Sequence, residues 1–355
     1  MRYAILLFPA LLLAACASSR LPAKRGSERP MAGPEYNENV PEATPRETVV
    51  LVADGLLKEG DSLFGQNKYD EARRKYEKAA EAAGNENNEQ VLVEALAQVA
   101  RMYSVEGKFD EGRPWLARAE EHADSEEPLG WSRFLGVQGR YFWRDEKDND
   151  KAKTTFIKMY EYCKEKKLFS RQLDAAHMVA IVAPPDEQVE WALNSIDAAE
   201  MAGEKGWLAV LWNNLGWTYE EQGEYPKMLE ALQNARKYHY EVGNDLSKLV
   251  ADFGVGRAWW RNKDFKQARN WIEQSFEQAQ QYHADQPDNT EFTEWVGWGN
   301  IYLADLLVDE NQPEEALKRY KAGRPLIVEA GIEDWWPEGL KEVDDKIAKL
   351  ESADD

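Results

Sequence analysis

Hydrophobic and polar positions follow a helical period from Thr48 to Leu350, and no stretch shows the convincing alternation of a β-strand. The pattern recurs about every forty residues as two amphipathic helices joined by a short polar turn. A small or slender residue anchors the second helix of each copy, at spacings of 40, 40, 40, 36, 40 and 48 residues. These anchors are Ala72, Gly112, Ala152, Ala192, Met228, Ala268 and Ala316. The steady period predicts an all-α solenoid of about seven helix pairs.

Polar turn signals divide each copy into its two helices. They are Gly65-Gln-Asn-Lys, Glu106-Gly-Lys, Asp145 to Asp150, Ala183-Pro-Pro-Asp, Glu221-Gln-Gly-Glu, Arg261-Asn-Lys-Asp and Glu310-Asn-Gln-Pro. The long step before the last copy contains Tyr282 to Thr293, which predicts an extended loop between repeats. After the last copy, Asp334-Trp-Trp-Pro337 predicts the start of a capping helix, with Asp334 accepting from its free amides and Pro337 in its first turn.

The fifth copy shows the clearest residue pattern. It has Trp212, Leu215, Gly216 and Tyr219 on the first helix, Tyr225 at the turn, and Leu232 and Ala235 on the second helix. This pattern resembles the tetratricopeptide repeat (TPR), and the match extends from Ala53 to near Gly331. The resemblance implies a right-handed α-solenoid whose first helices line a concave face. The third copy departs from the pattern, with Arg140 at the small position and Trp143 at the aromatic position.

In TPR proteins, the residue that follows the small packing residue of the first helix points into the concave groove. The resemblance places at these positions Asp61, Arg101, Tyr141, Ile181, Trp217, Arg257 and Asp305, with His177 and Phe253 among the residues one turn earlier. The middle of the groove is then apolar and aromatic, which is typical of a partner site because Trp, Tyr and Arg concentrate binding energy. The candidate binding residues are Phe134, Tyr141, Trp217, Phe253, Arg257, Trp260 and Trp298. In the alternative, the chain's own helices fill the groove.

The first residues have the features of an export signal. Arg2 precedes an apolar run that ends in Leu13-Ala14-Ala15-Cys16, which resembles the cleavage site of bacterial lipoproteins. The resemblance implies a signal peptide over 1–15, acylation of Cys16, and a place on the periplasmic face of the outer membrane, because Ala17 stands where an aspartate would favour retention at the inner membrane. The alternative is an ordinary secretory signal with an incidental cysteine. The following regions are a tether at 16–46, the solenoid at 47–331, and a capping helix with an acidic tail at 332–355.

Composition limits the classes of function. A formal net charge of −21 makes nucleic acid a poor partner. The ordinary explanation of this charge is that it keeps the protein soluble. With Cys16 assigned to lipid, Cys163 has no partner for an internal disulfide. The four histidines have no metal-ligand neighbours at helical spacing, and no cofactor loop or nucleophile motif occurs. The sequence therefore predicts no metal, no cofactor and no enzyme activity.

These observations together predict a lipid-anchored periplasmic scaffold or adaptor. It would bind an envelope protein or peptide in its aromatic groove, within an envelope assembly, and reach the membrane only through its lipid anchor. The alternative is a ligand-handling TPR lipoprotein associated with a periplasmic-binding-protein-dependent (TRAP-type) transporter, because an apolar channel could pass a small hydrophobic ligand.

Overall fold

The computed structural model describes residues 52 to 352, and in this range the regular structure is entirely α-helical. Sixteen helices follow one another in sequential pairs over these residues, as predicted. They are α2 (Val52–Gly65), α3 (Tyr69–Glu86), α4 (Glu89–Val105), α5 (Phe109–His122), α6 (Pro128–Arg144), α7 (Asn149–Lys166), α8 (Phe169–Val182), α9 (Pro185–Ala202), α10 (Lys205–Glu221), α11 (Tyr225–Val242), α12 (Asp245–Arg261), α13 (Phe265–Asp285), α14 (Thr290–Asp309), α15 (Pro313–Glu329), α16 (Ile332–Trp335) and α17 (Pro337–Glu351).

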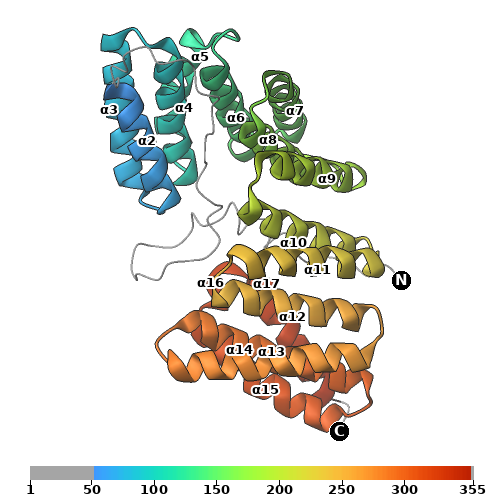
Figure 1. Ribbon diagram of the computed structural model, residues 1–355. Coiled ribbons are helices and arrows are strands. Elements are labelled where there is room, and N and C mark those ends of the chain that lie inside the picture. The colour runs from blue at the N-terminus through green and yellow to red at the C-terminus, as the bar shows by residue number, and fades with distance from the viewer. Residues whose placement is uncertain (1–51, 353–355) are drawn as a thin grey trace. The chain divides into compact units, whose positions relative to one another are not determined.

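The described residues form two compact units, and the boundary between Leu211 and Trp212 lies within α10. In the N-terminal unit, each helix from α2 to α9 packs against the next, apart from the weaker contact of α5 with α6, and α4 also packs against α6 (Figure 1). In the C-terminal unit, α11 to α15 continue the series, and α12 also contacts α14. We call α2, α4, α6, α8, α10, α12 and α14 the first helices of their pairs. The fold is therefore the predicted all-α solenoid of helix pairs.

A common turn joins the two helices in six of the seven pairs. One residue adopts the left-handed conformation in each, namely Asn67, Gly107, Lys147, Gly223, Lys263 and Asn311. The next amide donates to a carbonyl near the end of the first helix, for example Lys108 N to Tyr103 O at 2.9 Å and Glu224 N to Tyr219 O at 2.8 Å. This ending satisfies carbonyls that would otherwise lack donors. The fourth pair instead connects its helices through Ala183 and Pro184 in extended conformations.

Within the pairs, the helices approach closely where the first helix has a small residue. A Cβ atom at Gly60 or Gly139 would lie 2.5 Å from the ring of Tyr76 or Phe156, respectively. At Gly216, a Cβ atom would lie 2.6 Å from Leu232. Only glycine leaves room at these positions, because the facing side chains of the second helices already fill the space. The anchors predicted on the second helices are buried as well, apart from the half-buried Ala192.

Two local predictions from the sequence were wrong. In the third pair, Gly139 and not Arg140 occupies the small position, because Gly139 lies against Phe156. The Arg140 guanidinium instead donates to Asp174 at 2.7 Å. The region from Tyr282 to Thr293 is not an extended loop, because α13 continues to Asp285 and α14 starts at Thr290. The larger spacing between the last two repeats results from longer helices, of 21 and 20 residues.

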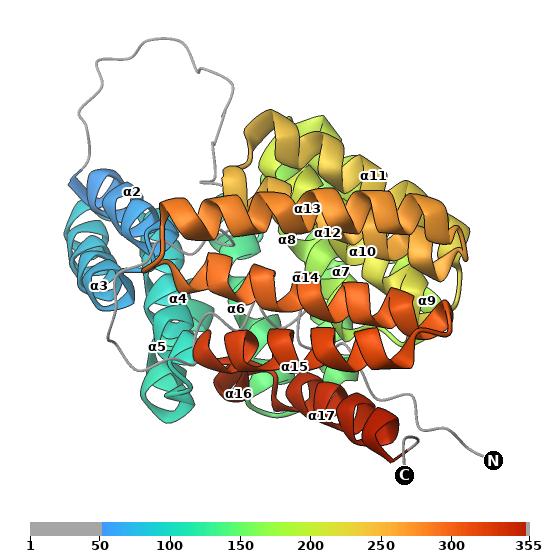
Figure 2. The same cartoon turned by 90° about the horizontal axis from the view of Figure 1, so that it is seen from below.

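The capping helix α17 packs against α15 (Figure 2). Leu340 and Val343 are buried in a cluster with Ile301 and Ile327 of the last pair. Its first residue is Pro337, as predicted, but Trp336 is the N-cap and contributes no side-chain hydrogen bond. The prediction that Asp334 caps this helix was wrong, since a separate turn of helix, α16, contains that residue.

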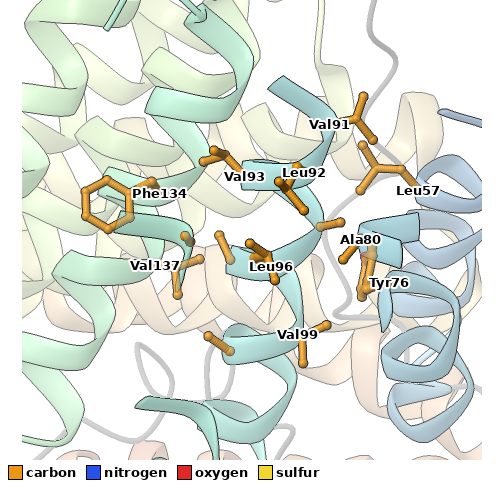
Figure 3. Packing of buried hydrophobic residues seen from close by; sticks show 14 of the residues in the cluster. Leu57, Tyr76, Ala80, Val91, Leu92, Val93, Leu96, Val99, Phe134 and Val137 are labelled. Atoms are coloured by element: carbon orange, nitrogen blue, oxygen red, sulfur yellow. The ribbon is translucent and has the colours of Figure 1, made fainter. Parts of the chain in front are cut away.

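The core of the N-terminal unit runs along α4. Figure 3 shows Leu92 and Leu96 of α4 between Tyr76 of α3 and Val137 of α6. All ten residues from 91 to 100 are buried, so this helix is covered on every side. Among residues 52 to 352, no helix is both long and apolar enough to cross a membrane.

The close approach at Gly139 can be tested with one substitution made at two glycines of the N-terminal unit. We expect Gly139→Ala to lower the free energy of unfolding by about 2 kcal/mol, because the new methyl group overlaps the buried ring of Phe156. The control is Gly84→Ala on the exposed side of α3, where a Cβ atom meets nothing within 4 Å. It should raise the free energy of unfolding by about 0.5–1 kcal/mol. Urea unfolding followed by circular dichroism measures both; equal effects would contradict this account.

Candidate partner-binding surface

A network of charged side chains links the first helices of the N-terminal unit. Arg171 of α8 donates to Glu94 of α4 at 2.5 Å, and both side chains are at least 95% buried. Arg133 of α6 lies 3.5 Å from the same Glu94 oxygen and 3.6 Å from Asp61 of α2. We call Asp61, Glu94, Arg133 and Arg171 the ion network. Such buried pairs require close charge matching, because each ion has lost its hydration.

Hydrogen bonds complete the surroundings of Asp61. Tyr76 donates its hydroxyl to Asp61 at 2.7 Å, and Gln98 donates its amide to the same oxygen at 2.9 Å. Burial raises the pKa of Asp61, but Arg133 and these two donors outweigh it and hold the pKa below its usual value. The carboxylate is therefore ionised at neutral pH and fixed in position.

The ion network reaches across an intervening helix pair. Glu94 and Arg171 belong to the second and fourth pairs, and their side chains meet directly although α6 and α7 separate them in sequence. Side chains of the unit therefore fill the space beside the first helices at this level. Side chains also fill the space near His177, whose ring lies 5.4 Å from that of Trp207. Burial lowers the pKa of His177 to about 4, and this effect outweighs the opposite effect of Asp174.

A series of aromatic rings connects helices of the C-terminal unit. Phe253 of α12 stacks on Trp295 of α14 at 5.3 Å, and Tyr302 lies 6.0 Å from Phe253. Trp298 stacks on Tyr302 at 5.9 Å and on Trp336 at 5.4 Å. The series ends at Trp335, whose ring lies 6.1 Å from that of Trp336.

Arg257 extends this series to α10. Its guanidinium lies 5.3 Å from the ring centre of Trp217 and 5.8 Å from that of Tyr302. Cation–π contacts of this kind hold an arginine against aromatic faces. We call the whole connected set the aromatic ladder. It consists of Trp217, Phe253, Arg257, Trp295, Trp298, Tyr302, Trp335 and Trp336.

One buried carboxylate contacts two guanidinium groups of this region. Arg257 donates to Glu220 at 3.0 and 3.1 Å, and Arg261 lies 3.0 Å from the same oxygen. Burial alone would lower the pKa of Arg257, but the Glu220 carboxylate reverses this effect and raises the pKa above its usual value. Arg257 therefore stays charged and holds Trp217 and Tyr302 in register.

Trp260 lies beside the ladder and belongs to the same region. Its indole nitrogen donates to Asp309 at 2.6 Å, and the Arg261 guanidinium lies 5.6 Å from its ring centre. Trp260, Trp217, Trp295 and Tyr302 are half-buried, and Trp335 is 38% exposed. These rings offer accessible aromatic area next to a fixed, buried set of rings.

The structure divides the seven predicted binding residues between the two units. Trp217, Phe253, Arg257 and Trp298 belong to the ladder, and Trp260 lies beside it, although Phe253 and Trp298 are buried. Phe134 and Tyr141 are in the core of the N-terminal unit (Figure 3 shows Phe134). Tyr141 donates to the carbonyl of Ala100 at 2.9 Å, in the space that Gly112 leaves open. Whether any of the seven contacts a partner stays a prediction.

The sequence analysis named Trp298 as a binding residue but missed four other members of the ladder, Trp295, Tyr302, Trp335 and Trp336. Trp295, Trp298 and Tyr302 recur at intervals of three and four residues, which places them on one face of α14. This spacing was visible in the sequence. The stacking of Trp336 on Trp298 was not, because it depends on where the capping segment folds. Glu94, Arg133 and Arg171 of the ion network had no sequence signal, since single charges on helices usually face water.

Other chemistry is limited in the part of the chain that the structure covers. From 52 to 352, no group of three or more His, Cys, Asp or Glu side chains could hold a metal ion. Cys163 is a free buried cysteine, and burial raises the pKa of its thiol to about 12. Cys16 lies outside the described residues.

Comparisons with known proteins support the fold. No family model matches the chain, and no curated protein matches it. A signal transduction ATPase with a tetratricopeptide repeat sensor from Pyrococcus horikoshii is similar in structure, with a TM-score of 0.55 and 14% identity over 86% of this chain. The match covers 50% of that protein, so this chain spans half of its length. The apo form of RapI gives a TM-score of 0.51 and 14% identity, over 79% of this chain and 75% of that chain. The fold is therefore a TPR-like helical repeat.

The ion network predicts that loss of its central carboxylate strongly lowers the free energy of unfolding. We expect Glu94→Gln to lower the free energy of unfolding by about 3 kcal/mol, because the guanidinium groups of Arg171 and Arg133 lose their shared counter-ion in a buried site. The control is Glu59→Gln, which breaks a solvent-exposed pair with Lys75 and should change stability by less than about 0.5 kcal/mol. Urea unfolding measures both variants, and indistinguishable midpoints would argue against a structural role for the network.

Proposed function

We propose that the protein is a TPR-like scaffold that binds a protein or peptide partner at the aromatic ladder of its C-terminal unit. The observation that carries the proposal is the combination of stacked, buried rings with half-exposed neighbours on α10, α12, α14 and α16. Rigid aromatic side chains lose little conformational freedom on binding and therefore contribute strongly to affinity. Binding, and not catalysis, is the activity that such a surface supports.

The contrast between the two units supports this assignment. Buried ion pairs occupy the space beside the first helices of the N-terminal unit, and such pairs would have to break before a partner could enter. Contact with Trp335 and Tyr302 of the ladder, or with Trp260 beside it, needs no such rearrangement, because these rings already have accessible area and the pair of Arg257 with Glu220 can stay intact. Preformed surfaces bind with smaller ordering costs.

We further propose that a lipid on Cys16 anchors the scaffold to the periplasmic face of the bacterial outer membrane, where its partner belongs to an envelope assembly. The sequence Leu13-Ala14-Ala15-Cys16 after an apolar run supports the anchor. The acidic composition supports it too, since a chain with a net charge of −21 gains little from direct contact with anionic lipid.

The partner site can be tested with a photo-crosslinking amino acid in place of Trp335, expressed in the source organism. We expect an adduct of defined mass on irradiation, and we expect Trp217→Ala/Trp260→Ala to lower its yield by roughly tenfold, because both rings contribute to one surface. The control places the crosslinker at Tyr240, an exposed aromatic outside the ladder that bonds to Asp252. Full adduct yield from a double variant with a normal circular dichroism spectrum would refute the proposed site.

The anchor is tested by Cys16→Ser. We expect the wild-type chain to incorporate labelled palmitate and to enter the detergent phase, and the variant to do neither, because a serine cannot form the thioether that carries the lipid. Mass spectrometry of the mature N-terminus gives an independent measurement. An unmodified cysteine there, or equal detergent partitioning of the two chains, would exclude the anchor.

A further inference from the structure

We propose that the aromatic ladder recognises a basic, extended peptide segment with a cationic side chain at about every third residue. This inference rests on the proposed function and adds the chemistry of the partner. It follows from two features of the C-terminal unit: carboxylates stand beside the accessible rings, and the ladder crosses successive helices at regular intervals.

Carboxylates accompany the accessible rings of this unit. Asp309 accepts a hydrogen bond from the Trp260 indole at 2.6 Å and is itself exposed. Trp335 is preceded by Glu333 and Asp334, which are both exposed. An aromatic face with a nearby carboxylate favours a cation, because the ring quadrupole and the full negative charge attract it together.

A carboxylate also lies near a ring at the centre of the ladder. Glu294 precedes Trp295 in the sequence and accepts a hydrogen bond from the Trp298 indole at 3.2 Å. Glu294 and Trp295 are both half-buried, so each is accessible in part. The Glu294 carboxylate therefore lies at Trp298, in addition to the carboxylates near Trp260 and Trp335.

Three cations and three carboxylates of this unit pair with one another in this region. Glu220 pairs with both Arg257 and Arg261, and Asp305 pairs with Lys346 at 2.9 Å. Lys346 also lies 3.2 Å from Glu342. These three cations and three carboxylates cancel in charge, so the further carboxylates of Asp309, Glu294, Glu333 and Asp334 leave the region negative. Complementary charge on a partner both speeds encounter and sets specificity.

The spacing of the helices determines the form of the segment. Contacts of Arg257 with Trp217 and Tyr302 tie α10, α12 and α14 together as neighbours. Packed helices lie roughly 8–10 Å apart, and three residues of polyproline II helix advance about 9 Å. An extended segment therefore meets a new helix with every third residue. In a polyproline II helix, every third side chain also lies on the same face.

The probe is a short synthetic peptide of Pro-Pro-Arg repeats, titrated into the full chain in detergent and followed by calorimetry. We expect it to bind, with affinity that falls as salt is added, because the attraction is electrostatic. A matched Pro-Pro-Glu peptide should not bind, and a Pro-Arg peptide with the wrong spacing should bind more weakly. We expect Trp335→Ala and Asp309→Asn each to weaken binding of the Pro-Pro-Arg peptide by roughly threefold to tenfold, whereas Tyr240→Ala leaves it unchanged.

Several outcomes would overturn the inference. These are no binding at low salt, equal binding of the arginine and glutamate peptides, or an affinity that Trp335→Ala does not change. Failure here is distinct from failure of the proposed function. A ladder that crosslinks its cellular partner but does not prefer the basic peptide remains a partner site with a different specificity. A ladder that fails both tests is not a partner site.

Discussion

The close approach of two helices at one small residue is the constraint on which the rest of the structure depends. Gly60, Gly139, Gly216 and Gly256 each lie under a large side chain of the following helix, at distances that no Cβ atom could share. This contact fixes the rotation of the first helix about its own axis. The residue after the glycine therefore lies on one defined side of the first helix. This position is occupied by Asp61, Arg140, Trp217 and Arg257. Packing within a pair thus determines which side chains the solenoid presents.

The two units have different side chains at the position after the glycine. In the N-terminal unit, Asp61 enters the ion network and Arg140 pairs with Asp174. In the C-terminal unit, Trp217 and Arg257 belong to the aromatic ladder. The same backbone geometry therefore carries members of ion pairs in the N-terminal unit, and a ring and an ion-paired arginine in the C-terminal unit. Because the glycine contact does not depend on the side chain of the next residue, the fold does not constrain this choice.

Much of the fold could be predicted from the sequence, since periodicity and turn residues act locally. The turn signals end and begin the helices where expected, because six of the seven turns use a left-handed residue such as Gly107 or Gly223 and the fourth uses the extended Ala183 and Pro184. The third pair was misplaced by one position because Gly139 and Arg140 adjoin, and only the ring of Phe156 shows which one faces the second helix. The long step between the last two repeats could equally lengthen a loop or two helices, and in the structure it lengthens α13 and α14.

The candidate site was predicted less well, because burial depends on distant contacts. Trp217 and Arg257 lie in contact with each other, whereas Tyr141 and Phe134 are in the core of the other unit. Their burial results from how α4, α5 and α6 pack, and a concave position in one repeat does not reveal this. The ion network could not be predicted for the same reason, because Arg171 pairs with Glu94, a residue of a helix pair two pairs earlier in the chain.

The two kinds of contact also differ in how they respond to change. An ion pair between Arg171 and Glu94 is favourable only at hydrogen-bonding distance, so it holds α4 and α8 at one separation and penalises others. Contacts between rings are broad in distance and angle, and several arrangements have similar energy. Both units contain such a fixed pair, Arg171 with Glu94 and Arg257 with Glu220, but only the C-terminal unit also has partly exposed rings that a partner can contact without breaking its pair. Physical chemistry thus favours binding at Trp217, Trp260 and Trp335 over binding beside Glu94.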